Sequence, residues 1–124
     1  MELLTRLGLA DVMTQRVGSL PYGRQRLIEI ALALAARPRV LLLDEPAAGV
    51  PESERGQILD VIDALPKDVA LVLIEHDMDL VFRFAKSISV LVNGALFMEG
   101  TPSQIANDPR VRQVYLGEEE IAHV

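Results

Sequence analysis

The sequence predicts an α/β domain with a mainly parallel sheet. Short apolar runs alternate with segments whose apolar residues recur at helical spacing, the order expected when each strand is followed by a crossover helix. Two runs, "VLLLD" at 40–44 and "VALVLIE" at 69–75, are apolar almost throughout, which is typical of strands covered on both faces. A later Asn-Gly pair between apolar runs predicts a β-hairpin. We therefore expect a parallel sheet with flanking helices, followed by an antiparallel hairpin.

Glycine and proline divide the predicted helices of the first half. A helix fragment is expected over 2–7, and a longer helix over 23–36 ends at Arg37-Pro38 because proline cannot continue it. The next helix begins near Pro51, where a missing N–H costs little, and ends before Pro66. Apolar residues share one face of each longer helix: Leu27, Ile30, Ala31 and Leu34 in the first, and Ile58, Leu59, Ile62 and Leu65 in the second.

The second half reads as a helix, a hairpin and a final helical region. A helix is expected over roughly 78–85, and "SISVLV" at 87–92 is the next strand. The chain should turn at Asn93-Gly94 and return antiparallel as "ALFME". Thr101 is the expected N-cap of the last helical region, with Pro102 at its first position. The final eight residues, "GEEEIAHV", are expected to fray.

Composition excludes several classes of protein. Eighteen acidic and 12 basic residues give a net charge of −6 without a basic stripe, which disfavours a nucleic-acid partner. The absence of cysteine excludes disulfides and thiolate chemistry. No apolar run approaches the length of a membrane span, and the N-terminus lacks the pattern of a signal peptide. We expect a soluble, intracellular protein whose contact with any membrane goes through a partner.

Carboxylates stand where the two apolar strands end. Asp44 and Glu45 follow the first strand, and "EHD" at 75–77 follows the second. Ligands of open α/β sheets bind beyond the carboxyl ends of the strands, so one carboxylate can hold a cation while its neighbour faces substrate. The alternative is an Asp that caps a turn beside a solvated Glu, and for an isolated motif that alternative is the commoner one.

Four stretches in this order resemble the ATP-binding subunit of an ABC transporter. "LPYGRQR" at 20–26 resembles the signature motif, "VLLLDEP" at 40–46 the Walker B strand, "AAGVP" at 47–51 the D-loop, and "IEHD" at 74–77 the switch-histidine loop. The tail from "VLVNGALFMEG" onwards is similar to the branched-chain amino acid (leucine, isoleucine, valine) uptake subgroup. The resemblance covers nearly the whole chain, but only the second half of such a subunit.

The resemblance implies a partial P-loop NTPase fold that lacks its phosphate-loop strand. It also implies one partial domain in three parts. Residues 1–37 end the helical subdomain, 38–100 run from Walker B through the hairpin, and 101–124 form the helical tail.

The resemblance also assigns roles to the carboxylates and the histidine. Asp44 helps to hold Mg²⁺ through its water shell, Glu45 orients the water that attacks the γ-phosphate, and His76 contacts that phosphate. Taken alone, His76 would more often be a structural histidine. His123 receives no role.

The signature loop is expected to present backbone N–H groups to the γ-phosphate of a nucleotide held by a facing subunit. Tyr22 could instead pack on its own helix, and Gly49 could be a turn glycine. The candidate nucleotide-binding residues are Ser19, Tyr22, Gly23, Arg24, Gln25 and Gly49.

Several features of the family are missing from these 124 residues. No G-x-x-x-x-G-K-[ST] phosphate loop occurs, nor do the Q-loop and the aromatic residue that stacks on adenine. Pro21 stands at the signature serine position, with Ser19 close by, and Pro51 stands where the D-loop often has Asp. Without the phosphate-loop strand two strand edges lack a partner. We expect self-association, exchange of elements in a strand-swapped dimer, or direct pairing of 69–75 with 87–92.

Two functions from different classes follow. The first is the C-terminal part of an ATPase that powers amino acid import with ATP and Mg²⁺. Its partners are permease subunits and a second ATP-binding subunit at the cytoplasmic face of the cell membrane. The missing phosphate loop argues against nucleotide binding or catalysis by this chain alone. The second is a non-catalytic remnant or interaction module that self-associates. A DNA-repair or chromosome-organising relative is disfavoured by the acidic balance.

Overall fold

A computed structural model describes residues 1–116 of the chain. The chain divides into two compact units, Met1–His76 and Asp77–Val124. The expected fraying of 117–124 lies outside the described residues, and the division of one domain into three parts stays a prediction.

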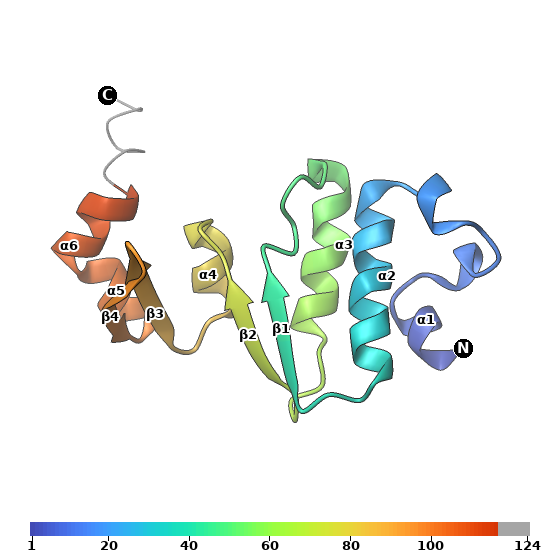
Figure 1. Ribbon diagram of the computed structural model, residues 1–124, viewed down its shortest axis with the longest axis horizontal. Helices are drawn as coiled ribbons and strands as arrows, with labels where there is room; N and C mark the ends of the chain where they lie inside the picture. The colour runs from blue at the N-terminus through green and yellow to red at the C-terminus, as the bar shows by residue number, and fades with distance from the viewer. Residues whose placement is uncertain (117–124) are drawn as a thin grey trace. The chain divides into compact units, whose positions relative to one another are not determined.

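The first unit is built around a parallel strand pair. β1 and β2 pair in parallel with α3 as the crossover, and α2 and α3 lie side by side next to the strands (Figure 1). The predicted elements are confirmed, with small shifts at their ends. In chain order the predicted elements are α1 (Glu2–Arg6), α2 (Tyr22–Ala35), β1 (Val40–Asp44), α3 (Glu52–Asp63) and β2 (Ala70–Ile74). Two 3-10 turns that were not predicted, η1 (Ala10–Val12) and η2 (Val17–Ser19), lie between α1 and α2.

Local sequence explains where the two long helices begin and end. α2 ends where Arg37 takes a left-handed φ of 51° and Pro38 follows, because a left-handed residue and a proline both stop helical hydrogen bonding. α3 has Pro51 as its N-cap residue, and Glu52 and Glu54 in its first turn complement the helix dipole. The apolar faces of both helices are buried, with Leu27 and Ile58 almost fully enclosed.

The sheet of the first unit is covered on one face only, so the expectation of strands covered on both faces is wrong. Leu41 is 4% exposed, whereas its neighbour Leu42 is 69% exposed. Side chains alternate along a strand, and the register pairs Leu42 with Val72, so the exposed side chains of both strands share a face. We call this the open face. Its large apolar members are Val40, Leu42, Val72 and Ile74.

The second unit is a hairpin packed against short helices, as predicted. Positive φ at Asn93 (50°) and Gly94 (77°) forms the tight turn. Thr101 caps α5 as expected, and Gln104 completes a capping box that the sequence analysis did not identify. The elements are α4 (Met78–Phe84), β3 (Ile88–Val92), β4 (Ala95–Gly100), α5 (Pro102–Asn107), α6 (Pro109–Val111) and the π-helical turn η3 (Arg112–Leu116).

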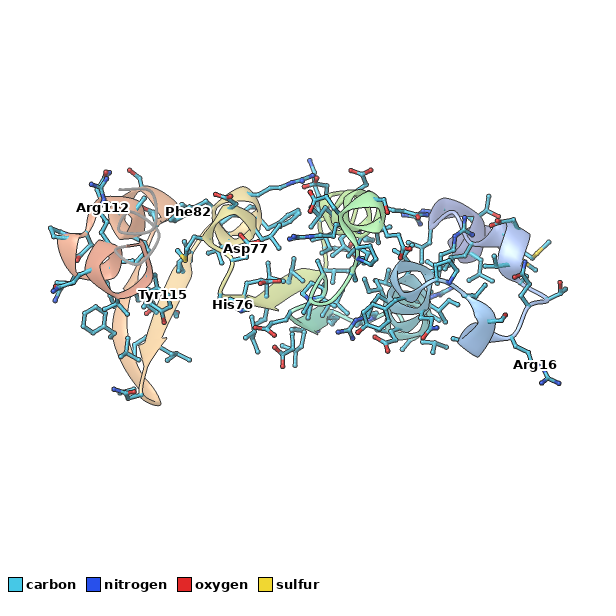
Figure 2. All side chains as sticks on the ribbon, turned by 90° about the horizontal axis from the view of Figure 1, so that it is seen from above. Arg16, His76, Asp77, Phe82, Arg112 and Tyr115 are labelled. Atoms are coloured by element: carbon cyan, nitrogen blue, oxygen red, sulfur yellow. The ribbon has the colours of Figure 1, made fainter. Side chains whose placement is uncertain are left out.

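The second unit has its own core of Ile88, Val90, Ile105 and Val111. Phe82 and Tyr115 pack against it, and both are labelled in Figure 2. The Tyr115 hydroxyl donates to the Leu91 carbonyl over 2.8 Å.

Strand pairing decides one of the three expectations about the missing strand. β2 pairs with β1 and β3 with β4, in two separate two-stranded sheets, so direct pairing of 69–75 with 87–92 is wrong. The Asn93-Gly94 turn gives β3 a local partner in β4 at little cost in loop-closure entropy. Self-association and exchange of elements stay predictions. Within residues 1–116, no helix has the length and apolar character needed to cross a bilayer.

Neighbouring leucines of β1 test the one-sided sheet. Leu41→Ala is expected to lower the free energy of unfolding by about 2–5 kcal/mol, because it opens a cavity in the core. Leu42→Ala is the matched control and should change it by about 0.5 kcal/mol or less. Urea denaturation of both variants measures the difference. An equal loss for Leu42→Ala would mean that the open face is covered in solution.

Candidate functional site

The parallel register brings the ends of β1 and β2 to one edge of the sheet. Asp44, the last residue of β1, is the register partner of Ile74. The Glu45 N–H then donates to the Ile74 carbonyl over 2.9 Å, so strand pairing extends one residue beyond Asp44. Glu45 and His76, separated by 31 positions in the sequence, are therefore neighbours in space.

Glu45 and His76 are hydrogen-bonded. His76 Nδ1 lies 2.5 Å from Glu45 Oε1. In a hydrogen bond to an ionised carboxylate, which can only accept, the imidazole nitrogen is the donor. The two side chains are 42% and 76% exposed, and Figure 2 shows His76 where β2 ends. A carboxylate oriented by an imidazole and open to solvent can position a water molecule, and the exposed imidazole can contact a phosphate group.

Glu45 holds a conformation that few residues with a side chain adopt. Its φ is 46°, in the left-handed region, which for such a residue costs about 1–3 kcal/mol. Two backbone bonds keep it there: its N–H donates to Ile74, and its carbonyl accepts from Ala48. Backbone strain of this kind clusters at functional sites. The turn aims the carboxylate at His76 instead of continuing the strand.

Asp44 is exposed at the strand end next to Glu45. Within residues 1–116, no group of three or more His, Asp and Glu side chains could hold a metal ion. Mg²⁺ needs no such cage, since it keeps several waters and is bound through one or two carboxylates together with substrate phosphates. A lone exposed carboxylate beside the candidate catalytic Glu45 fits that mode of binding.

The signature stretch forms the N-terminus of α2, with Pro21 at the N-cap and no side-chain cap from it. Gly23 is buried, and its N–H donates to Glu54 Oε2 over 2.6 Å. Glu54 was not among the residues predicted from the sequence. Its place in the first turn of α3 is fully explained by the dipole of its own helix, so no sequence signal pointed to a role at α2.

Three candidate nucleotide-binding side chains hold the loop itself together. Ser19 donates to the Arg16 carbonyl over 2.7 Å, and Gln25 donates to the Leu20 carbonyl over 2.9 Å. Arg24 pairs with Asp11 over 2.8 Å. This hydrogen bond lowers the pKa of Asp11 below its usual value. These polar groups therefore shape the loop from within.

The D-loop stretch lies against the signature stretch. Gly49 has a φ of 72°, so the chain turns there in a conformation that favours glycine, and a Cβ at Gly49 would lie 3.6 Å from the Tyr22 ring. The Tyr22 ring also stacks with Arg26, whose guanidinium carbon is 5.3 Å from the ring centre. Tyr22 is partly exposed. The structure thus brings Tyr22, Gly23 and Gly49 together, while their roles toward a nucleotide stay predictions.

Comparison with known proteins decides the family. The family described as "ABC transporter" matches residues 1–48, and the family described as "Branched-chain amino acid ATP-binding cassette transporter" matches residues 97–121. The chain belongs to the ABC transporter ATP-binding family. The predicted family and its branched-chain amino acid subgroup are thereby confirmed.

Curated relatives and solved structures agree. The chain is 42% identical over 117 residues to the high-affinity branched-chain amino acid transport ATP-binding protein BraF of Pseudomonas aeruginosa, covering 93% of this chain and 46% of that protein. It is 40% identical to LivG of Escherichia coli K12, with the same coverage. A crystal structure of the ADP conformation of an ATP-binding cassette of an ABC transporter matches with a TM-score of 0.79. That match has 30% identity and covers 94% of this chain and 48% of that one.

These matches confirm the predicted ABC ATPase fold class, with its small parallel sheet and its hairpin. The chain spans about half the length of the curated relatives it matches.

The Arg24–Asp11 pair predicts a pH effect. Arg24→Ala should raise the pKa of Asp11 toward its ordinary value of about 3.9. The pKa of Asp11 is lower in the folded chain than in the unfolded chain. The ion pair therefore stabilises the fold at a pH above the unfolded-state pKa, and this contribution is lost as the pH falls through the folded-state pKa. NMR titration of the Asp11 carboxyl carbon measures the change. Arg39→Ala, which removes the same charge elsewhere, is the control, and an unchanged pKa in Arg24→Ala would contradict the assignment.

Proposed function

We propose that the chain is the C-terminal part of the ATP-hydrolysing subunit of an ABC importer for branched-chain amino acids. The hydrogen bond between Glu45 and His76 carries the proposal. It joins a carboxylate and an imidazole at the carboxyl end of a parallel sheet, where ligands of such sheets bind. The names of the relatives supply the substrate class, since BraF and LivG are described as branched-chain amino acid transport proteins.

Each candidate residue has a role in phosphoryl transfer, which depends on positioning and charge stabilisation. Glu45 orients the attacking water, and its hydrogen bond to His76 fixes the direction of the carboxylate. His76 is exposed enough to reach a terminal phosphate oxygen with its other ring nitrogen. Asp44 would contribute a carboxylate to the shell of a bound Mg²⁺, and the ion would neutralise charge on the phosphates. The N-terminus of α2 offers backbone N–H groups to phosphate.

The proposal requires a phosphate loop from another polypeptide segment, because none occurs in these residues. Relatives carry roughly as much chain again, and the open face offers exposed apolar side chains for that extra segment to cover. We assign the phosphate-loop half of an ATP-binding subunit as the occupant of the open face. Permease subunits, a second ATP-binding subunit and a place at the cytoplasmic face of the membrane belong to the same proposal.

A second candidate is a non-catalytic interaction module that self-associates. The open face also favours this function, since an uncovered apolar sheet face and its unpaired strand edges promote association between copies. The two candidates differ in what restores activity. A phosphate-loop half restores hydrolysis only under the first.

Reconstitution tests the proposed function. The purified chain is mixed with a separately produced first half of the Pseudomonas aeruginosa relative, ending where the match to this chain begins, and Mg²⁺-dependent ATP hydrolysis is measured. Hydrolysis should appear in the mixture and fall by about 10²-fold or more with Glu45→Gln, because general-base assistance contributes 10²–10⁴-fold. Glu75→Gln, one residue before His76, is the control for loss of a nearby carboxylate and should retain activity.

The result that would contradict the proposal is a mixture that assembles, as judged by its mass, without hydrolysing ATP. Hydrolysis that is equally fast with Glu45→Gln would contradict the assigned role of Glu45. A stable dimer of the chain that excludes the first half would favour the interaction module.

A further inference from the structure

The backbone N–H of the signature glycine is already occupied by a carboxylate of the same chain. Gly23 N donates to Glu54 Oε2 over 2.6 Å in a partly buried setting. α2 is 14 residues long, and its first-turn N–H groups carry the positive end of the helix dipole. A carboxylate at this position makes a charge-assisted hydrogen bond, which is stronger than a neutral one.

Pro21 explains why the acceptor comes from so far away in the sequence. A Ser, Thr, Asn or Asp at the N-cap would accept from the second or third N–H of the helix, but Pro21 has no side-chain acceptor and makes no cap bond. Gly23 is the second residue of α2. Glu54, 31 positions further on in the first turn of α3, supplies the missing acceptor.

The Glu54 side chain lies directly against Gly23. A Cβ added to Gly23 would lie 2.5 Å from Glu54 Oε2 and 2.7 Å from the Glu54 Cβ. An oxygen that accepted from the same N–H along the same direction would overlap the carboxylate. The Glu54 carboxylate and a second anion bound at the same N–H would also repel each other.

We propose that Glu54 is an intramolecular gate on the signature loop. Its carboxylate occupies the position at Gly23 that the terminal phosphate of a nucleotide takes, and it must swing away before phosphate binds. The inference rests on the proposed function, which makes this loop a phosphate site. The exchange replaces one anion with another at the same N–H and breaks no covalent bond.

The gate also links two functional loops. Glu54 lies in α3 just after the D-loop stretch, and its own N–H donates to the Pro51 carbonyl over 2.9 Å. Binding of phosphate at Gly23 therefore breaks the hydrogen bond that connects the start of α3 to the start of α2. A nucleotide at the signature loop is sensed by the D-loop of the same chain through Glu54.

Titration of the full, isotope-labelled chain with sodium tripolyphosphate tests the gate, with the Gly23 amide resonance as the readout. Glu54→Gln keeps the size of the side chain and removes its charge. It should lower the dissociation constant of tripolyphosphate, measured at the Gly23 amide, about tenfold or more. A tenfold change corresponds to about 1.4 kcal/mol at 25 °C. Glu52→Gln is the matched control: it makes the same charge change in the same turn of α3, and its ion pair is with Arg55. It should leave the constant within about twofold.

Each other outcome counts against a defined part of the account. Equal affinity in the unsubstituted chain and in Glu54→Gln would overturn the gate and leave the signature loop a phosphate site. Equal tightening by both substitutions would also overturn it, because net charge would then explain the effect. If the chemical shift of the Gly23 amide changes in no variant on titration, both the proposed function at this loop and the gate are contradicted. If Glu54→Gln fails to fold by circular dichroism, Glu54→Ala undergoes the same titration and should lower the dissociation constant in the same way.

Discussion

The parallel pairing of β1 with β2 is the constraint on which the candidate site depends. The register sets Asp44 opposite Ile74, and the hydrogen bond from Glu45 to Ile74 carries the pairing one residue further. Only this register places the Glu45 carboxylate beside His76. A slip of one residue would turn every side chain of one strand to the other face. The strained turn at Glu45 is held by the same backbone bonds, so strand pairing and site geometry cannot be separated.

The same strand pair supports the proposal that a further polypeptide segment covers this chain. Helices bury Leu41 and Leu43, while the alternate residues on the open face stay exposed. A sheet this small cannot bury both faces with the elements of the first unit. The chemistry is equally one-sided, since the residues that could activate water and hold Mg²⁺ are present and the loop that cradles phosphate is absent. An additional polypeptide would complete the core and the site together.

The sequence predicted the helices, the strands and the family because local signals were strong. Pro38, Pro66 and Asn93-Gly94 mark the ends of helices and strands through backbone chemistry alone. The family was predicted from four motifs that occur in the expected order. Prediction failed where the outcome depended on neighbours distant in the chain. The apolar composition of β1 could not reveal that one of its faces lacks a partner. The left-handed φ of Glu45 and the hydrogen bond from Gly23 to Glu54 arise from tertiary packing. No neighbouring residue in the sequence predicts either feature.

Cross-linking of engineered cysteines measures the β1–β2 register most directly, since the chain contains no cysteine of its own. Leu42→Cys combined with Val72→Cys places two thiols on register partners of the open face, and a short bifunctional thiol reagent should join them within one chain. Leu42→Cys with Leu73→Cys points the second thiol to the opposite face and should not cross-link. The account predicts fast intramolecular cross-linking of the first pair only. Preferential cross-linking of the second pair would mean a shifted register, and would contradict the placement of Glu45 beside His76.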